Sequence, residues 1–265
     1  ALPRFVHWGR PLPHPETLVH LYDALKPQRV SGALDNTAWP SILPTQSEAW
    51  IGAQRIDIRR DGRETFCDFS VVAISPAVGD NEGASMISVD AQDADQQVAL
   101  HWTCELTDSG LIRQCATVTN LGDGTLDVNG IELGYPLPQQ AVEILTTTGH
   151  HLHERSPQRQ PLTVGRFEKL SMAGRPDFDA SLLLTAGAPG FGFEHGDVYS
   201  VHVGWSGNSV LSAERLPYTQ GVIGGGEKLF GGEIALEHGG QYTTPWVYGA
   251  FGTGLNEVAH RFHGF

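Results

Sequence analysis

Long apolar runs are missing from this sequence, and so is an excess of basic residues. No apolar stretch reaches the roughly 18 residues that read as a membrane-spanning helix, so we expect no membrane partner. The chain carries 30 acidic and 17 basic residues, which gives a net charge of −13. Because an acidic protein repels phosphate backbones, nucleic acid is also excluded from the expected partners.

Cysteine is scarce as well, with only Cys67, Cys104 and Cys115 in the chain. An odd and sparse set argues against a disulfide framework. The stretch "HWTCELTDSGLIRQCATV" is typical of two strands joined by a tight turn. With the turn at Ser109 and Gly110, Cys104 would face Cys115 across the hairpin. A cross-strand disulfide and buried free thiols are therefore both open, and the sequence favours buried thiols.

The apolar core of a signal peptide is absent from the N-terminal stretch "ALPRFVHWGR". We therefore expect a cytoplasmic protein. The chain has no initiator Met, so a leader removed before Ala1 stays an alternative.

Glycine and proline are abundant, at 32 and 16 residues, and they separate short apolar runs as turn residues do. From about residue 51 to 135, many runs alternate apolar and polar residues, which predicts β-strands. Turn signals such as "RRDGR", "TDSG" and "LGDG" separate them. A polar segment at 145–180 is expected to be extended and loop-rich, and strand patterns resume after it. So many strands predict an all-β fold, a large antiparallel sandwich of two sheets.

Helix signals occur near both ends of the chain. The stretch "HPETLVHLYDAL" predicts a short helix, after a short strand at "RFVHWG". Near the C-terminus, Leu255, Val258, Ala259 and Phe262 fall at i, i+3, i+4 and i+7, which gives a helix with one apolar face. Thr253 is its expected N-cap. The apolar face either packs back on the sandwich or leads into a further domain.

Chemical motifs are weak. The glycine-rich "GVIGGGEKLFGG" lacks the Gly-Lys-Ser/Thr of a phosphate-binding loop, so we expect a turn or bulge there. The stretch "WSGNS" is not a nucleophile motif and predicts a turn between strands. His150, His151 and His153 have no acidic or thiol partner at a metal-ligand spacing, and His260 and His263 lack a third ligand. We therefore expect no metal and no cofactor, and a surface or subunit-contact loop at the first cluster.

One loop has the composition of a sugar site. In "DNTAWPSILPTQSEAWIGAQR", Trp39 and Trp50 accompany the polar Arg55. Sugar sites combine an aromatic platform with polar side chains, so Trp50, Arg55 and Trp39 are the predicted substrate-binding residues. For each tryptophan taken singly, burial in the core is the favoured explanation, and it is the pair in one proline-rich loop that indicates an exposed contact.

Five stretches, in order, resemble the N-terminal domain of family 36 glycoside hydrolases, the bacterial α-galactosidases. The resemblance implies a β-supersandwich of the galactose-mutarotase-like type over residues 1–252 and the start of a linker helix at 253–265. In that family a (β/α)8 barrel with two catalytic aspartates follows. This chain has no Lys-Trp-Asp motif and no alternating βα pattern, so we expect no catalytic residue in it and no activity from the chain alone. The stretches are "RFVHWGRPL", "SILPTQSEAWIGAQRIDIRRDG", "GHHLHERSPQRQPLTVGRFEKLSMAGR", "GDVYSVHVGWSGNSVLSAERLPYTQGVIGGGE" and "QYTTPWVYGAFGTGLNEVAHRFHGF".

The resemblance also implies the role of a longer parent, a retaining α-galactosidase that acts on α-1,6-galactosides such as melibiose and raffinose. The implied partners are galactoside oligosaccharides, the catalytic barrel and further copies of the same protein, because the family commonly forms tetramers. In the family, the loop that matches residues 45–55 can border a neighbour's active site. Many members carry Asp-aromatic-Arg there, and "WIG" at 50–52 departs from that pattern.

Two other functions stay open. A stand-alone carbohydrate-binding module would use the tryptophan-rich loop. A mutarotase-like sugar epimerase would use a histidine and a carboxylate as acid and base, with His151, His195 and His202 available for it.

Overall fold

Antiparallel pairing joins the strands of this protein throughout the part that the computed structural model describes, residues 1–14, 18–27, 39–78, 85–176 and 182–265. In chain order the strands are β1 (Ile56–Arg60), β2 (Arg63–Glu64), β3 (Ser70–Val78), β4 (Ser85–Asp93), β5 (Val98–Leu106), β6 (Ile112–Asn120), β7 (Leu126–Ile131), β8 (Leu133–Leu137), β9 (Glu143–His150), β10 (His153–Pro161), β11 (Gly165–Ser171), β12 (Leu184–Gly187), β13 (Asp197–Val203), β14 (Ser209–Arg215), β15 (Gly221–Glu227), β16 (Ile234–Leu236), β17 (Gln241–Thr243) and β18 (Val247–Thr253).

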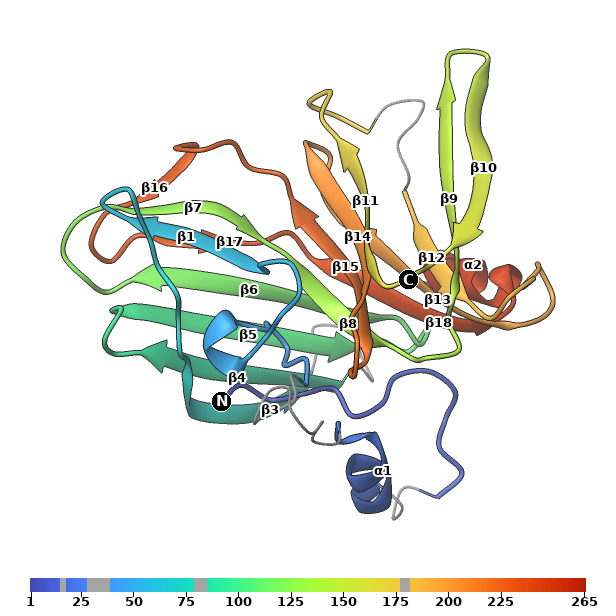
Figure 1. The fold of residues 1–265 in the computed structure, drawn as a ribbon, viewed down its shortest axis with the longest axis horizontal. Helices are drawn as coiled ribbons and strands as arrows, with labels where there is room; N and C mark the ends of the chain where they lie inside the picture. The colour runs from blue at the N-terminus through green and yellow to red at the C-terminus, as the bar shows by residue number, and fades with distance from the viewer. Residues whose placement is uncertain (15–17, 28–38, 79–84, 177–181) are drawn as a thin grey trace.

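These strands form two layers (Figure 1). One layer is a ten-stranded sheet in the order β10-β9-β12-β13-β18-β6-β5-β4-β3, with β17 also paired to β6. The other layer consists of two four-stranded sheets, β16-β7-β1-β2 and β11-β14-β15-β8. Only Glu132 separates β7 from β8, so the two small sheets continue one another. The predicted all-β sandwich is confirmed, with its second layer divided at Glu132.

The N-terminal segment is not the predicted strand, but it closes one side of the core. Residues 1–8 form no strand, and Trp8 reaches the sandwich through its side chain. Its indole stacks on Tyr135 at 4.7 Å between ring centroids, and its Nε1–H donates to the carbonyl oxygen of Pro136 at 2.6 Å. The Tyr135 hydroxyl donates to the carbonyl oxygen of Val247 at 2.7 Å, so the segment is fastened across both layers.

Both predicted helices are present. Helix α1 (Leu18–Leu25) follows the N-terminal segment, and helix α2 (Leu255–His263) follows β18. The apolar face of α2 packs back on the sandwich, with Val258 buried against Ala250 and Val198. The N-cap is Gly254, so the prediction of Thr253 was wrong by one residue. The backbone N–H of Thr253 instead donates to the Glu257 carboxylate at 2.7 Å, so the first turn reaches back to stabilise the end of β18.

The hairpin of β5 and β6 settles the state of the cysteines. Its connection is residues 107–111, so Thr103 pairs with Cys115 and Cys104 pairs with Gln114. Neighbouring residues of a strand face opposite sides of the sheet, so Cys104 and Cys115 do not face each other. The turn expected at Ser109 and Gly110 was one residue out of register. All three cysteines are free thiols, as the favoured interpretation had it.

Two further segments differ from expectation. Gly224, Gly225 and Gly226 lie inside β15, between β14 and β8, and not in a turn. A Cβ on Gly225 would collide with the carbonyl oxygen of Val210 in the neighbouring strand, so only glycine fits there. The segment at 145–180 is extended but mostly strand, and it contains β10 and β11.

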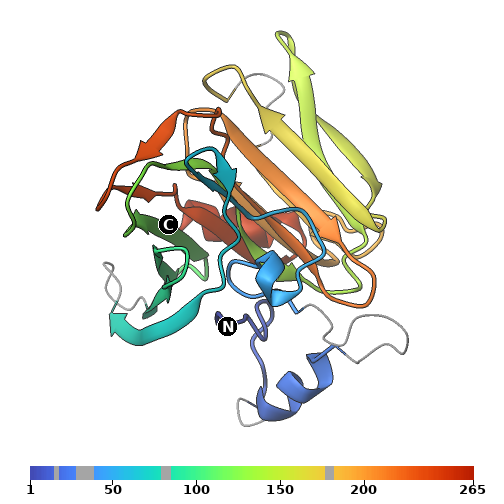
Figure 2. The same cartoon turned by 60° about the vertical axis from the view of Figure 1, so that its left-hand side comes forward.

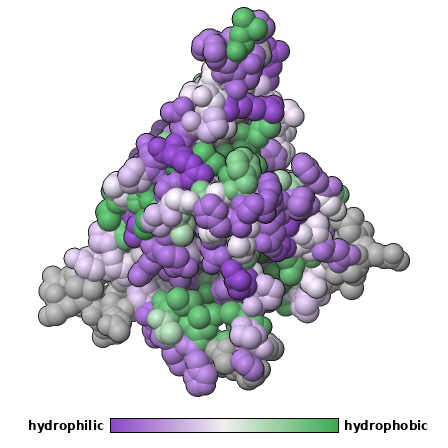
Figure 3. Space-filling view, turned by 90° about the vertical axis from the view of Figure 1, so that its right-hand side faces the viewer, coloured by the Kyte–Doolittle hydropathy of each residue, from purple (hydrophilic) through white to green (hydrophobic). Residues whose placement is uncertain are grey.

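The hairpin of β9 and β10 forms an arm that projects from the body, at the top of Figure 3. Every residue of β10 is exposed. His150 and His153 lie at its tip with ring centroids 5.3 Å apart. Within the described residues, no group of three or more His, Cys, Asp or Glu side chains is placed to hold a metal ion. No helix in the same part of the chain is long and apolar enough to cross a membrane.

Candidate functional site

The loop that precedes β1 lies across the end of the hairpin formed by β14 and β15 (Figure 2). Trp50 is its anchor, since its indole is 4% exposed and packs against Val222 and Leu216. The indole Nε1–H donates to the carbonyl oxygen of Ala53 at 2.8 Å. Ile51 projects instead, with 51% of its surface exposed. The loop therefore presents Ile51 outward, while the predicted sugar contact of Trp50 stays a prediction.

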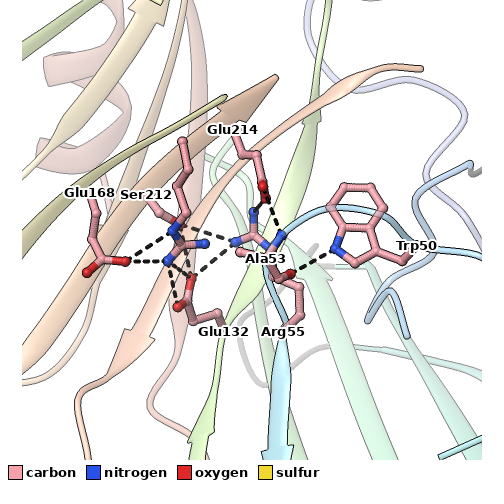
Figure 4. Close-up of polar contacts among 8 residues, drawn as sticks. Trp50, Ala53, Arg55, Glu132, Glu168, Ser212 and Glu214 are labelled. Atoms are coloured by element: carbon pink, nitrogen blue, oxygen red, sulfur yellow. Dashed lines mark hydrogen bonds and ion pairs between the residues drawn. The ribbon is translucent and has the colours of Figure 1, made fainter. Parts of the chain in front are cut away.

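Arg55 follows this loop and is fully buried where the two small sheets meet (Figure 4). Its Nη1 lies 3.1 Å from Glu132 Oε2, and its Nη2 lies 3.0 Å from Glu214 Oε2. Nη1 also donates to the Ser212 hydroxyl at 3.2 Å. Glu132 interrupts the second layer between β7 and β8, and β14 supplies the other two partners. The guanidinium thus ties together the strands at the seam of the second layer.

A second arginine extends the cluster. Arg166 of β11 donates to both carboxylate oxygens of Glu132, at 2.7 and 2.9 Å, and to Glu168 at 2.8 Å. The charges alternate along the series Glu214, Arg55, Glu132, Arg166 and Glu168 (Figure 4). Among the described residues, Arg55 Nε and Arg166 Nη1 are buried without a hydrogen-bond partner.

The two guanidinium groups respond differently to their surroundings. Burial lowers the pKa of Arg55, and Arg166 lowers it further, while Glu132 and Glu214 oppose the shift without cancelling it. Burial also lowers the pKa of Arg166, but Glu132 and Glu168 outweigh it and leave that pKa raised. Arginine starts so far above neutral pH that both groups remain charged. The cluster is therefore a set of true ion pairs.

Glu214 connects this cluster to the loop. Its Oε2 pairs with Arg55, and its Oε1 accepts the backbone N–H of Ala53 at 2.8 Å. Ala53 in turn accepts from the Trp50 indole, so the loop is held on both sides of its tip. The cluster's carboxylates are engaged by arginines, which suits a rigid support for a loop better than acid–base chemistry.

Trp39 belongs to a different cluster. Its indole is 8% exposed and lies beside the Tyr22 ring of α1, with centroids 5.0 Å apart. The Arg4 guanidinium lies 5.9 Å from the ring centroid, and Arg4 Nε donates to the Trp39 carbonyl oxygen at 3.1 Å. Of the three predicted residues, the structure links Trp50 with Arg55 through Ala53 and Glu214, and it places Trp39 apart from them, beside α1.

The histidines considered for an epimerase lie on separate elements. His151 is in the turn of the arm, His195 is in the connection between β12 and β13, and His202 is in β13. The rings of His195 and His202 bond to the backbone carbonyl oxygens of Gly190 and Leu182. Within the described residues, these three histidines therefore do not meet at one site, and His151 lies 3.8 Å from the Glu154 carboxylate at the exposed tip of the arm.

Most of the charge cluster was missed by the sequence reasoning. One signal was available, because Ser212 and Glu214 alternate with apolar residues inside β14 and share one face of the strand. Their partners cannot be read from the sequence. The residues missed are Glu132, Arg166, Glu168, Ser212 and Glu214.

Comparison with known proteins adds the family context. The model of the glycosyl hydrolase family 36 N-terminal domain matches residues 1–237. An α-galactosidase of Escherichia coli is 30% identical over 161 residues, which are 60% of this chain and 23% of that protein.

Solved structures share the fold. A variant of the α-galactosidase AgaA from Geobacillus stearothermophilus, in complex with raffinose, superposes with a TM-score of 0.85 at 17% identity over 98% of this chain and 39% of its own. The galactosidase domain of the α-galactosidase-sucrose kinase AgaSK superposes with a TM-score of 0.76 at 21% identity over 84% of this chain and 33% of its own. The present chain thus spans well under half the length of these relatives.

Proposed function

We propose that this chain, which belongs to the N-terminal domains of glycosyl hydrolase family 36, forms the non-catalytic β-sandwich of an α-galactosidase. The E. coli relative carries that name, and AgaA was solved in complex with raffinose and with stachyose. The substrate class that follows is the terminal α-galactosides of the melibiose and raffinose type.

The domain's proposed role is to shape a substrate subsite and to support assembly. The observation that carries this proposal is the contact between Glu214 and the loop. One carboxylate holds both Arg55 and the Ala53 N–H, so Ile51 is presented on a loop of fixed conformation. A loop that is already ordered loses little conformational entropy when it contacts a sugar or a second subunit. Catalysis is assigned to a barrel beyond the α2 linker segment, 253–265.

The cluster's carboxylates support a non-catalytic role. Retaining glycosidases need two carboxyl groups that face each other across the sugar, with roughly 5 Å between them. Glu132, Glu168 and Glu214 are instead engaged with Arg55 and Arg166. Their oxygens accept from guanidinium N–H groups, so these carboxylates are not placed to face each other across a sugar.

The test compares the isolated chain with the full-length protein. We expect residues 1–265 to leave a nitrophenyl α-galactoside intact, while the full-length protein hydrolyses it. Hydrolysis by the isolated chain would overturn the proposal, provided that the activity coelutes with the purified domain. A full-length protein that hydrolyses no α-galactoside would overturn the assignment of the parent.

A further inference from the structure

A groove outside the charge cluster has the composition of a small-molecule site. The end of α1 (residues 24–27), the turn after β8 (residues 138–140) and the turn before β15 (residues 218–220) enclose about 400 Å³. Figure 2 shows α1 lying below the end of the β14–β15 hairpin. This volume falls in the range of sites that hold small ligands.

The groove's polar groups suit a ligand rich in hydroxyl groups. Gln139, Gln140 and Gln220 contribute amides, and Thr219 contributes a hydroxyl. An amide offers both donors and acceptors, as a sugar hydroxyl also does, so the two are complementary. Lys26 is the only charged residue among the described residues that line the groove. The lining therefore favours a neutral polar ligand.

Two of these groups lack a partner. Thr219 Oγ1 and Gln220 Oε1 are buried, and neither has a hydrogen-bond partner among the described residues. Native proteins rarely leave buried polar atoms unpaired, and such atoms point to a missing water or ligand. Both atoms are shielded from solvent in this structure, so a ligand hydroxyl in the groove donates to them only when the turn at 218–220 shifts.

Tyr218 provides an aromatic surface at the rim. It is 66% exposed, and its φ is 67°, in the left-handed region that bulky residues seldom adopt. Backbone strain of this kind gathers at binding sites, where the surrounding structure imposes it. Here it places a large aromatic side chain at the solvent edge of a polar groove.

We propose that this groove binds a neutral saccharide of one to three units, at a site separate from the loop of Trp50. The proposal does not require a catalytic barrel. It draws on the proposed function only for the choice of a galactoside as the probe. Shallow, open sugar sites of this kind bind in the millimolar range, so a method suited to weak binding is needed.

The test is a titration of isotope-labelled chain 1–265 with raffinose, followed by amide NMR shifts, with glycerol as the control ligand. We expect saturable shifts at residues 138–140 and 218–220 with raffinose and none that saturate with glycerol. Tyr218→Ala should weaken binding about fivefold, as the loss of an aromatic contact does. Phe230→Ala is the matched control, since Phe230 is an exposed aromatic (56%) outside the groove, and its affinity should equal that of the wild type.

Gln139→Ala gives a second test that does not depend on the strained residue, and it should also weaken binding. The proposal is wrong if raffinose shifts the groove no more than glycerol does, or if both groove variants bind as the wild type does. Saturable shifts confined to residues 50–55 would also overturn it and place the sugar at the loop. The proposed function is tested separately, because this titration uses the isolated chain and does not measure hydrolysis.

Discussion

Arg55 and Glu214 are 159 residues apart in the chain, yet their side chains form a buried ion pair with Nη2 and Oε2 3.0 Å apart. This pair joins the loop before β1 to the inner part of β14. A buried ion pair need not add net stability, because desolvation of the charges opposes their attraction. The ion pair instead fixes the position of the loop where it joins β1.

Removal of the Arg55 charge should strongly destabilise the domain. Arg55→Met leaves Glu214 buried without its cation and leaves Glu132 with Arg166 alone, which costs about 3–5 kcal/mol of unfolding free energy. Urea denaturation measures it. Arg10→Met is the matched control, because the Arg10–Asp197 pair is exposed, at 64% and 36%, and should contribute less than about 1 kcal/mol. Equal losses in the two variants would contradict a structural role for the cluster.

The adjacent residues Trp50 and Ile51 should separate packing from surface contact. Trp50→Ala removes a buried indole and should lower the unfolding free energy by about 3–5 kcal/mol. Ile51→Ser alters an exposed side chain and should change it by less than about 0.5 kcal/mol. Denaturation of the two variants under one set of conditions tests this difference.

In a full-length galactosidase, both variants should raise KM more than they lower kcat, because the loop is assigned to binding and not to chemistry. A fall in kcat at constant KM would argue against subsite shaping.

The three thiols should be unreactive in the folded protein. Burial raises the pKa of Cys67 and Cys104 to about 12, and that of Cys115 to about 11. Thiolates are the reactive species, and almost none form at mildly alkaline pH. Ellman's reagent should therefore react slowly with the native chain and titrate all three cysteines in guanidinium. A single thiol in denaturant would show that a disulfide had formed.

Acid should loosen the start of α2. The Thr253 backbone N–H lowers the pKa of Glu257, and Arg261 adds to this effect, while burial opposes it. A carboxyl group whose folded pKa is lowered stabilises the fold above its unfolded pKa, and this contribution is lost as the pH falls through the folded pKa. Glu257→Gln should therefore be less stable than the wild type near neutral pH, and the difference should shrink as the pH falls below the ordinary glutamate pKa of about 4.3 and be lost once the pH passes the lowered folded pKa. A difference that stays constant across this range would contradict the assignment.

Two glycines offer a paired test of the packing between β14 and β15. Gly225→Ala places a methyl group against the Val210 carbonyl oxygen and should cost about 1–3 kcal/mol or more. A Cβ on Gly130 of β7 meets nothing within 4 Å, so Gly130→Ala should stay within about 0.5 kcal/mol of the wild type. Thermal unfolding distinguishes them, and similar midpoints would show that β15 can shift to admit a side chain.

Local patterns predicted many of the elements, because strands with one buried face show that face in their own sequence. In β6, for example, buried and half-buried residues alternate from Gln114 to Asn120. Patterns failed where side chains give no signal, as in the glycines of β15, and where loop length sets register, as at Cys104 and Cys115.

The charge cluster was beyond sequence reasoning for a different reason. Arg55 pairs with residues 77 and 159 positions away, and only the folded second layer brings them together. The loop itself was found from its composition, and the structure added what holds it.

A single residue, Gly254, separates β18 from helix α2, and β18 is hydrogen-bonded to β13 on one side and to β6 on the other. A force applied to Phe265 would act first on the apolar contacts of Val258 with the sandwich and then on β18, an interior strand of the large sheet. Such a strand moves along its length only if the ladders on both sides break together. The large sheet is therefore mechanically stiff at this point. A displacement imposed at the C-terminal end would move the whole sheet before it stretched the connection between β18 and α2.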